Sequence, residues 1–388
     1  MTRYIFETED VIEESSDAVT IVRDKKTFKD FYYADRIVYK NDSRWVPPLW
    51  EEMKDFFKAK NLFWIHATTR LFVAYSKDKP VGRIAVFIDK KFIETMKENI
   101  GFFGFFECIN NLDIAYSLLK AAETYLASQS IPTMIGPVNG RVDMGCGILF
   151  KGFEEDPYIY DTYTPRYYIT LLETYGMKKY KDLVSYKLDA TKPIPTSLKA
   201  AAKRCGENGI SIRRFNRLRA NRELKWWIPL MMDVFSNHWG YIQVSQKEVK
   251  NRFGVRQIRW IVDPGLFLIA EKNNEPVAFK WVLPDYNQIF KLLDGKLGLK
   301  GYLLFLLKKN QLINRAKFNF VGVKKEYRGQ GIASYMNYYT LKELKRRGYR
   351  YAEIGWIDEE NTPERKATEK LGVELSKIYR IYSKPVKP

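Results

Sequence analysis

The sequence predicts a mixed α/β protein that contains two copies of one α/β unit. Strand-like and helix-like patterns alternate along the 388 residues, which favours a mixed sheet with helices on both faces. Two stretches, 80–89 and 276–285, each follow an apolar run and a polar turn, and both are typical of the second strand of a hairpin. They lie 196 residues apart, since 276 − 80 and 285 − 89 give the same offset. The same offset links Glu173 with Glu369, Gly176 with Gly372 and Tyr186 with Tyr382, which indicates a duplicated unit.

Each copy is expected to contain the same elements in the same order. A first strand, at 19–22 and again at 210–215, leads through one or two amphipathic helices to the hairpin. After the hairpin come a third strand, a long helix, a further strand and a helix that ends at glycine. In the first copy these four are expected at 101–108, at 112–129, at 133–138 and before Gly176, and in the second at 317–323, at 332–347, at 351–357 and before Gly372.

A proline-rich stretch at 190–196 separates the two copies. At about 100–200 residues per domain, the chain is long enough for two or three domains. We therefore expect one domain over residues 1–190 and a second over residues 191–388.

The composition argues against several classes of protein. Three cysteines cannot cross-link a chain of this length, and the two histidines, His66 and His238, have no zinc-binding spacing, so no metal is expected. The N-terminal residues are acidic and lack the apolar core of a signal peptide. No apolar run approaches the 18 or so residues that span a bilayer. These features predict a soluble, cytoplasmic protein.

The chain is strongly basic. Its 65 Lys and Arg exceed its 46 Asp and Glu by 19 charges, and residues 300–388 alone hold 20 basic and 9 acidic side chains, a net charge of +11. Such a field attracts phosphates, whether on a cofactor, on a nucleic acid or on an anionic membrane. Charge alone does not identify the partner.

One motif carries chemistry. The expected strand at 317–323 is followed by Arg328-Gly-Gln-Gly-Ile-Ala333, and a long helix begins at once. Free backbone N–H groups and the positive end of the helix dipole meet at such a helix N-terminus. Gly329 and Gly331 remove side chains, and Arg328 adds a permanent positive charge. The motif therefore predicts a binding site for a pyrophosphate.

This arrangement resembles the acyl-CoA signature of the GNAT N-acetyltransferase superfamily, in which R-x-x-G-x-A follows a strand that ends V-x-V. The element order resembles that family over about residues 210–385, and the first half has the same order without the signature. The whole is similar to bacterial double-GNAT proteins. The resemblance implies two tandem GNAT-like folds and direct transfer of an acyl group from acetyl-CoA or another acyl-CoA to an amine. It implies the following acyl-CoA-binding residues: Val321, Val323, Arg328, Gly329, Gln330, Gly331, Ile332, Ala333 and Asn361.

The sequence departs from the family pattern at the expected general acid. Many GNAT enzymes have a tyrosine four residues before the glycine that ends the last helix, and this chain has Thr368 there. Tyr379 and Tyr382, on the strand after that helix, are candidate replacements. Asp285, Glu353 and Asp358 are candidates for the general base, and the sequence does not choose among them.

The first copy lacks the motif. It has no glycine at the corresponding helix start, and Glu107 and Asp113 would place negative charge near the phosphates. We expect this copy to be non-catalytic and to shape the substrate groove. The insertion at 287–313 combines a run of leucines with Lys308 and Lys309, which suits a substrate lid, a surface-docking helix or ordinary packing against the sheet.

Two other functions remain open. A duplicated GNAT-like fold can also transfer amino acids from aminoacyl-tRNA, and the basic charge would suit an RNA donor, although the retained signature argues against it. The absence of the tyrosine keeps open a silent acyl-CoA-binding protein. Neither the acceptor, a small molecule or a peptide amine, nor the oligomeric state has a signature in the sequence.

Overall fold

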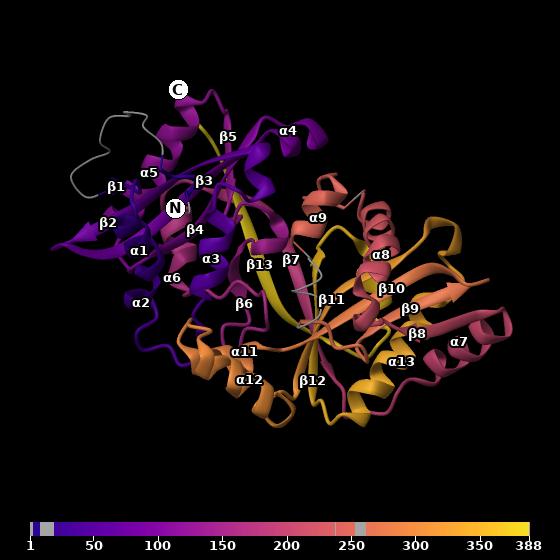
Figure 1. Cartoon of the computed structure of the whole chain (residues 1–388). Coiled ribbons are helices and arrows are strands. Elements are labelled where there is room, and N and C mark those ends of the chain that lie inside the picture. The colour runs from indigo at the N-terminus through magenta and orange to yellow at the C-terminus, as the bar shows by residue number, and fades with distance from the viewer. Residues whose placement is uncertain (1–2, 8–18, 237, 253–260, 388) are drawn as a thin grey trace. The chain divides into compact units, whose positions relative to one another are not determined.

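The computed structural model describes residues 3–7, 19–236, 238–252 and 261–387, and it confirms the expected mixed α/β class (Figure 1). The chain forms two compact units, of which the first comprises Met1–Leu183, Phe290–Gly301 and Lys377–Pro388, and the second Val184–Ile289 and Tyr302–Ser376. Neither unit is one continuous stretch of chain. The boundary expected after residue 190 lies just past the strand β7 (Lys178–Asp189), which begins in the first unit and ends in the second.

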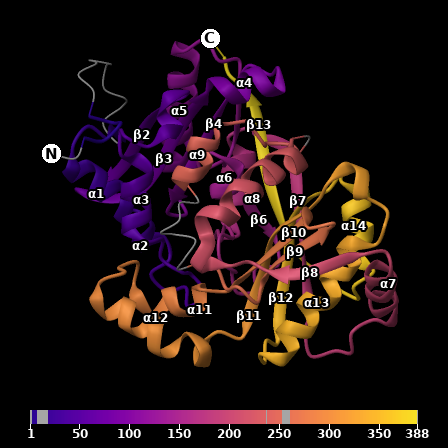
Figure 2. The ribbon, with the colours of Figure 1, turned by 45° about the vertical axis from the view of Figure 1, so that its right-hand side comes forward.

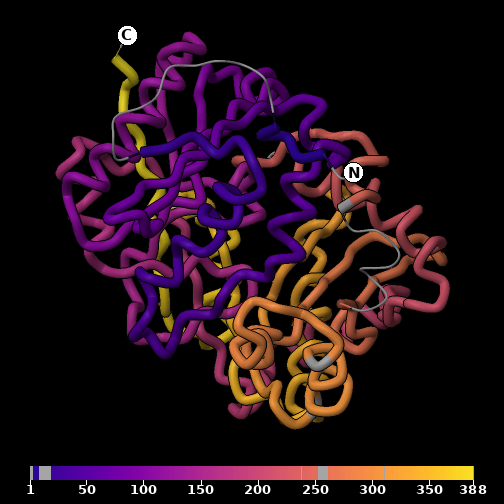
Figure 3. The backbone as a smooth tube through the Cα atoms, turned by 60° about the vertical axis from the view of Figure 1, so that its left-hand side comes forward, coloured from indigo at the N-terminus to yellow at the C-terminus, as the bar shows by residue number. Residues whose placement is uncertain are grey.

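The sheet of the first unit has the strand order β1-β2-β3-β4-β5-β13, and β6 pairs with β13. The expected hairpin is formed by β2 and β3, and the last strand of the chain pairs with β5. Figure 3 shows this yellow C-terminal segment among the indigo and magenta parts of the first unit. The strands are β1 (Val19–Ile21), β2 (Ala67–Ser76), β3 (Lys79–Asp89), β4 (Ile100–Cys108), β5 (Thr133–Gly136), β6 (Ile148–Lys151) and β13 (Glu374–Pro385). The helices are α1 (Lys25–Tyr33), α2 (Asp35–Val38), α3 (Trp50–Phe57), α4 (Lys90–Met96), α5 (Leu112–Ser128) and α6 (Tyr167–Thr174).

The core of the first unit forms where α5 packs on the sheet. Leu118 and Leu119 of α5 are completely buried among apolar side chains of the strands. This close approach needs glycine on the sheet, because a Cβ atom at Gly101 would lie 2.3 Å from Cδ2 of Leu126. The apolar periodicity of α5 is therefore matched by a strand that leaves room for it.

The sheet of the second unit has the strand order β12-β11-β10-β9-β8, with β7 beside β12. The second expected hairpin is formed by β9 and β10. The strands are β8 (Ile210–Arg214), β9 (Phe267–Lys272), β10 (Glu275–Pro284), β11 (Arg315–Val323) and β12 (Tyr351–Asp358). The helices are α7 (Thr196–Glu207), α8 (Ala220–Phe235), α9 (Gln246–Arg252), α11 (Asn287–Phe290), α12 (Leu299–Leu312), α13 (Ile332–Arg346) and α14 (Thr362–Glu369).

Helices cover the two faces of this second sheet (Figure 2). On one face, α7 and α13 pack together and place Cys205 and Met336 in a buried cluster with strand residues. On the other face lies α8, whose buried Trp227 makes edge contacts with the rings of Phe279 and Trp281. We call these the α13 face and the α8 face.

Candidate functional site

The strands β11 and β12 separate from one another in the middle of the second sheet. Their parallel pairing covers only Arg315–Phe318 against Tyr351–Ile354, although β11 continues to Val323 and β12 to Asp358. Residues 321–323 of β11 therefore lie beyond the ladder with β12, while their other side remains paired with β10. Backbone groups on that open side can take an added strand-like ligand. We call the point after Phe318 and Ile354 the fork.

A bulge in β11 lies at the fork. Trp281 of β10 pairs with Phe320 and the next residue, Val282, pairs with Phe318, so Asn319 has no opposite residue. An extra residue of this kind reverses which face the following side chains point to. The bulge also increases the local twist, which favours the separation of the two strands.

The loop after β11 has the geometry expected of an anion site. Arg328 is exposed and its Nε donates a hydrogen bond to the carbonyl oxygen of Val323, at 3.2 Å. Gly331 is the N-cap of α13 and makes no side-chain capping bond. The amides of Ile332 and Ala333 belong to the first turn of α13, where no helical carbonyl can accept from them. The loop therefore presents unused N–H donors at the positive end of a fifteen-residue helix.

The two glycines are needed for their backbone angles. Gly329 and Gly331 have φ values of 77° and 84°, a region that L side chains rarely adopt. At Gly331 a Cβ atom would be 3.7 Å from Sγ of Cys205, which is an ordinary contact distance. Conformation rather than space therefore explains glycine at this position.

His238 lies close enough to the loop for the charge of Arg328 to act on it. Burial lowers the pKa of His238, the positive charge of Arg328 lowers it further, and the carboxylate of Asp358 opposes both. Asp358 ends β12, and its Oδ1 accepts a hydrogen bond from the N–H of Glu360 at 3.0 Å.

Lys280 is a buried lysine that sequence reasoning missed. It lies on β10 opposite Val321, is only 4% exposed, and its Nζ donates a hydrogen bond to Asn337 of α13. The ammonium is 4.3 Å from the centre of the Phe318 ring, at the fork. Burial lowers the pKa of Lys280 to about 7, and the Glu364 carboxylate on α14 opposes this only in part. In the sequence, Lys280 stands out as a single charged residue within the apolar strand that contains Val277.

Glu353 lies at the fork on the opposite face from Lys280. It pairs in register with Lys317 and is 3.5 Å from its Nζ. Lys317 lies opposite Leu283, and Leu283 points to the other side of β10 from Lys280 because strand side chains alternate. Glu353 therefore points toward the α8 face, whereas Lys280 points toward the α13 face.

The remaining carboxyl candidate, Asp285, lies away from the loop at 328–333 that follows β11, which we call the anion loop. It follows β10 and forms an ion pair of 2.6 Å with Arg315, the first residue of β11. The loop follows the last residue of β11, Val323, eight residues further along the same strand. Asp285 is completely buried. The structure thus does not bring Asp285 together with Arg328.

Asn361 caps the helix α14. Its Oδ1 accepts from the N–H of Glu364 at 3.3 Å, and its Nδ2 donates to the Glu364 carboxylate at 2.7 Å. The same Glu364 carboxylate acts on Lys280, whose pKa it raises. Asn361 therefore positions a charge near the fork besides ending the loop after β12.

The two candidate tyrosines belong to the first unit. Tyr379 is completely buried where β13 pairs with β6, opposite Leu149. Tyr382 donates to a Glu173 carboxylate oxygen at 3.0 Å, and burial raises its pKa. Both side chains are packed in the core of that unit.

The first copy has no open fork. Its strands β4 and β5 pair as far as Phe102 and Ile135, but the chain after β5 then stays beside β4. The N–H of Val138 donates to the carbonyl of Phe103 at 2.7 Å, and the N–H of Phe105 donates to Oδ1 of Asn139 at 2.6 Å. The place that is open in the second copy is filled by the protein's own backbone.

The helix start of the first copy is also closed. Asn111 caps α5 by accepting from the N–H of Ile114 at 3.0 Å, and Asp113 occupies the first turn. Burial raises the pKa of Glu107 to about 7, and the hydroxyls of Tyr39 and Tyr168 donate to its carboxylate. A capped helix start with Asp113 in its first turn is a poor anion site.

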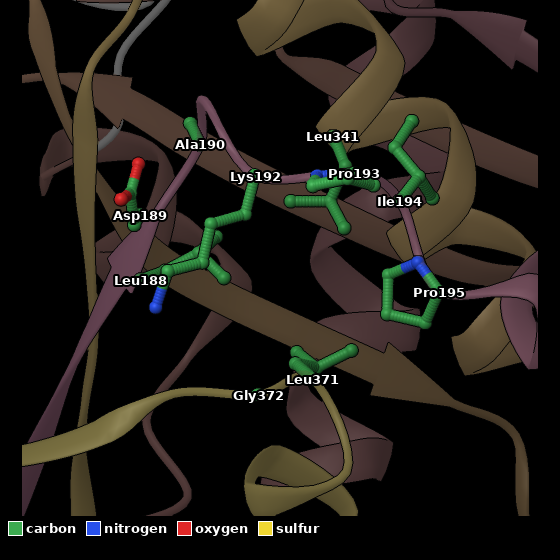
Figure 4. A pocket seen from close by; sticks show the side chains of 10 residues that line it. All are labelled: Leu188, Asp189, Ala190, Lys192, Pro193, Ile194, Pro195, Leu341, Leu371 and Gly372. Atoms are coloured by element: carbon green, nitrogen blue, oxygen red, sulfur yellow. The ribbon is translucent and has the colours of Figure 1, made fainter.

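A surface pocket of about 240 Å³ lies elsewhere in the second unit (Figure 4). Its walls come from the end of β7, the proline-rich stretch after it, Leu341 of α13 and Leu371. Figure 4 shows the side chains of Pro193, Ile194 and Pro195 along one side. None of the predicted site residues lines this pocket.

Comparison with known proteins agrees with the tandem GNAT resemblance. Residues 231–373 match the model of the Acetyltransferase (GNAT) family, and this stretch contains the fork, the loop and α13. Two solved structures have the same fold over nearly their whole length: a tandem GNAT protein from the clavulanic acid biosynthesis pathway (11% identity, 95% of this chain and 98% of that chain, TM-score 0.57) and a GCN5-related N-acetyltransferase from Sphaerobacter thermophilus (14% identity, 97% and 98%, TM-score 0.54).

Two further proteins are similar in sequence along most of the chain. One is named bacterial ceramide synthase, from Caulobacter vibrioides, with 27% identity over 88% of this chain and 91% of the relative. The other is protein YghO from Escherichia coli, with 27% identity over 93% of this chain and 94% of the relative.

Proposed function

We propose that this protein is an N-acyltransferase that acylates the amine of a long-chain amino alcohol with an acyl-CoA, since residues 231–373 match the Acetyltransferase (GNAT) family and the chain has a tandem GNAT fold. The observation that carries the proposal is the open fork with the uncapped anion loop in the second copy alone. The acceptor is suggested by the relative named ceramide synthase, since a ceramide is the amide of a fatty acid and a long-chain amino alcohol.

The residues of the second copy fit an acyl-CoA. The amides of the loop and Arg328 would hold the pyrophosphate, and the side of residues 321–323 that faces away from β10 would pair with the pantetheine arm. Lys324 and Lys325 add positive charge beside the same loop. Bound in this way, the donor supplies a thioester at the fork.

Two residues on opposite faces of the sheet would handle the protons. Glu353, on the α8 face, would take a proton from the acceptor ammonium so that the amine nitrogen can attack the thioester carbonyl. Lys280, on the α13 face, would give its proton to the sulfur as the carbon–sulfur bond breaks. A lysine with a pKa near 7 is a strong enough acid to protonate a thiolate, whose ordinary pKa is about 8.5.

The protons balance. An acceptor ammonium loses two protons when it becomes an amide: one ends on sulfur and the other reaches solvent. After Lys280 has given its proton to the sulfur, one of the protons that the nitrogen releases protonates its amine again. This assignment would supply the acid that the missing tyrosine leaves unfilled, and it is supported by Glu364, one helical turn before Thr368 on α14, whose carboxylate acts on Lys280.

The first test is binding of acyl-CoA by isothermal calorimetry with the full chain and with Ala333→Glu. Ala333 is exposed in the first turn of α13, where a carboxylate favours the helix but repels a pyrophosphate. We expect one site per chain and a loss of at least tenfold in affinity in the variant. Ala333→Gln, of the same size and without charge, is the matched control and should bind nearly as well as the parent.

The second test is release of free CoA with a panel of amines. Turnover with a long-chain amino alcohol, and little with short amines, would support the proposed acceptor. Binding without turnover on any amine would leave a silent acyl-CoA-binding protein. No binding to either variant or parent would contradict the assignment of the loop.

A further inference from the structure

The helix α12 (orange in Figure 1) carries a stripe of large apolar side chains that the protein leaves exposed. Leu299 is 89% exposed, Leu303 is 57%, Leu306 is 51% and Leu307 is 66%. Tyr302 is also exposed, at 43%. Single exposed leucines are common on protein surfaces, but several on one helix mark a contact site.

The stripe runs along one side of the helix. Positions 299, 302, 303 and 306 are spaced i, i+3, i+4 and i+7, which places them on one face. The opposite side is the one that packs on the protein: Gly301 is buried, and the ring of Phe305 is 5.2 Å from that of Tyr286. The exposed leucines are therefore not the inward face of the helix.

The charge on α12 indicates what could cover the stripe. The helix contains no acidic residue, and Lys308 and Lys309 follow the leucines directly. Residues 300–388 carry a net charge of +11, from 20 basic and 9 acidic side chains. Leucines that insert, a tyrosine beside them and lysines that remain in water match the boundary between the acyl chains and the anionic headgroups of a bilayer.

The helix suits a position on a membrane rather than across it. It has 14 residues, and at 1.5 Å per residue it is about 21 Å long, which is short of the hydrocarbon core of about 30 Å. Among the described helices, none combines the length and the apolar character that crossing a membrane requires.

We propose that α12 docks this protein on anionic membrane surfaces by inserting Leu303, Leu306 and Leu307. Lys309, which is i+7 from Tyr302 and i+3 from Leu306, lies at the edge of the stripe and contacts the headgroups. The helix connects β10 to β11 at the end of β11 opposite the anion loop. Docking by α12 would therefore leave the anion loop facing water. The proposal does not depend on the identity of the acceptor.

Vesicle flotation with the full chain tests the proposal. We expect the protein to float with vesicles that contain phosphatidylglycerol and much less with pure phosphatidylcholine vesicles. Leu303→Glu with Leu306→Glu should lower binding at least tenfold, and Lys309→Glu should weaken the preference for anionic vesicles. Leu218→Glu is the matched control, because Leu218 is 82% exposed on another segment and should have no effect.

Other outcomes would overturn the proposal. Equal flotation of the parent and the leucine variant, or none of either, contradicts docking by α12. A dimer in light scattering that the leucine variant converts to a monomer, without vesicle binding, would show that a second copy covers the stripe. Because flotation requires no turnover, its result is independent of the acyl-transfer assays, and circular dichroism verifies that each variant is folded.

Discussion

Lys280 and Glu353 lie at the same fork of the second sheet but point to opposite faces of it. Lys280 is held by Asn337 of α13 and Glu353 by Lys317 of β11. A thioester at the fork would therefore have an acid on one side and a base on the other. The following predictions concern these residues and the closed fork of the first copy.

Replacing Lys280 should affect catalysis more than binding. In Lys280→Met the sulfur loses its proton donor, so we expect kcat to fall by about 10²–10⁴-fold, with KM for acyl-CoA changed little. Steady-state release of CoA measures both constants. Lys280→Arg should be equally inactive, because a guanidinium keeps its proton; an active arginine variant would contradict the acid role.

The pH dependence of kcat should report the same group. The active form of Lys280 is the ammonium, and its pKa is lowered to about 7 by burial, so kcat should decrease as pH rises through about 7. This decrease should be absent from whatever activity remains in Lys280→Met. A parent profile that still rises between pH 7 and 9 would exclude Lys280 as the acid.

Stability should also depend on Lys280. Between pH 7 and about 10.5 the folded protein holds a neutral amine while the unfolded chain holds an ammonium, so the unfolded state binds more protons and stability increases with pH. Relative to Lys280→Met, the free energy of unfolding of the parent should rise by about 2 kcal/mol between pH 7.5 and 9. Urea unfolding at both pH values gives this difference, and a constant difference would mean that the pKa is not lowered.

Glu353→Gln should separate a chemical role from a structural one. Both partners of the buried Glu353–Lys317 pair are needed for stability, so Glu353→Gln and Lys317→Met should each destabilise the protein by about 3 kcal/mol. Only Glu353→Gln should remove the rise of kcat on the acid side of the pH profile. If the two variants have the same profile, the pair is structural.

The closed fork of the first copy predicts a stability effect without an effect on binding. Asn139→Ala removes the acceptor of the Phe105 N–H and should lower the free energy of unfolding by about 1–3 kcal/mol. The number of acyl-CoA sites measured by calorimetry should stay at one per chain. Asn111→Ala, which removes the cap of α5, is a control of similar expected cost.

Much of the fold could be predicted because its signals are local. The hairpins β2–β3 and β9–β10 follow from alternating apolar residues around a polar turn, and α13 follows from its apolar period and its glycine start. The anion loop was likewise readable, since its donors come from consecutive residues. The assignment of Arg328 and its neighbours to acyl-CoA stays a prediction.

The choice among the candidate catalytic residues was not readable, because it depends on partners far apart in the chain. Asp285 looks like a free carboxylate until Arg315, thirty residues later, is seen to pair with it. Tyr379 follows α14 in sequence yet lies in the core of the first unit.

The sequence by itself determined the duplicated α/β plan and the glycine loop, because period, turn chemistry and motif spacing act over a few residues. Only the tertiary structure decided which copy keeps an open fork and which charges flank it. Val138 and Asn139 close the first fork through hydrogen bonds to another strand, and Lys280 loses its solvent when α13 packs over it. Burial and pairing across the fold set the charge of such groups, and neither can be predicted from the residues next to them in the chain.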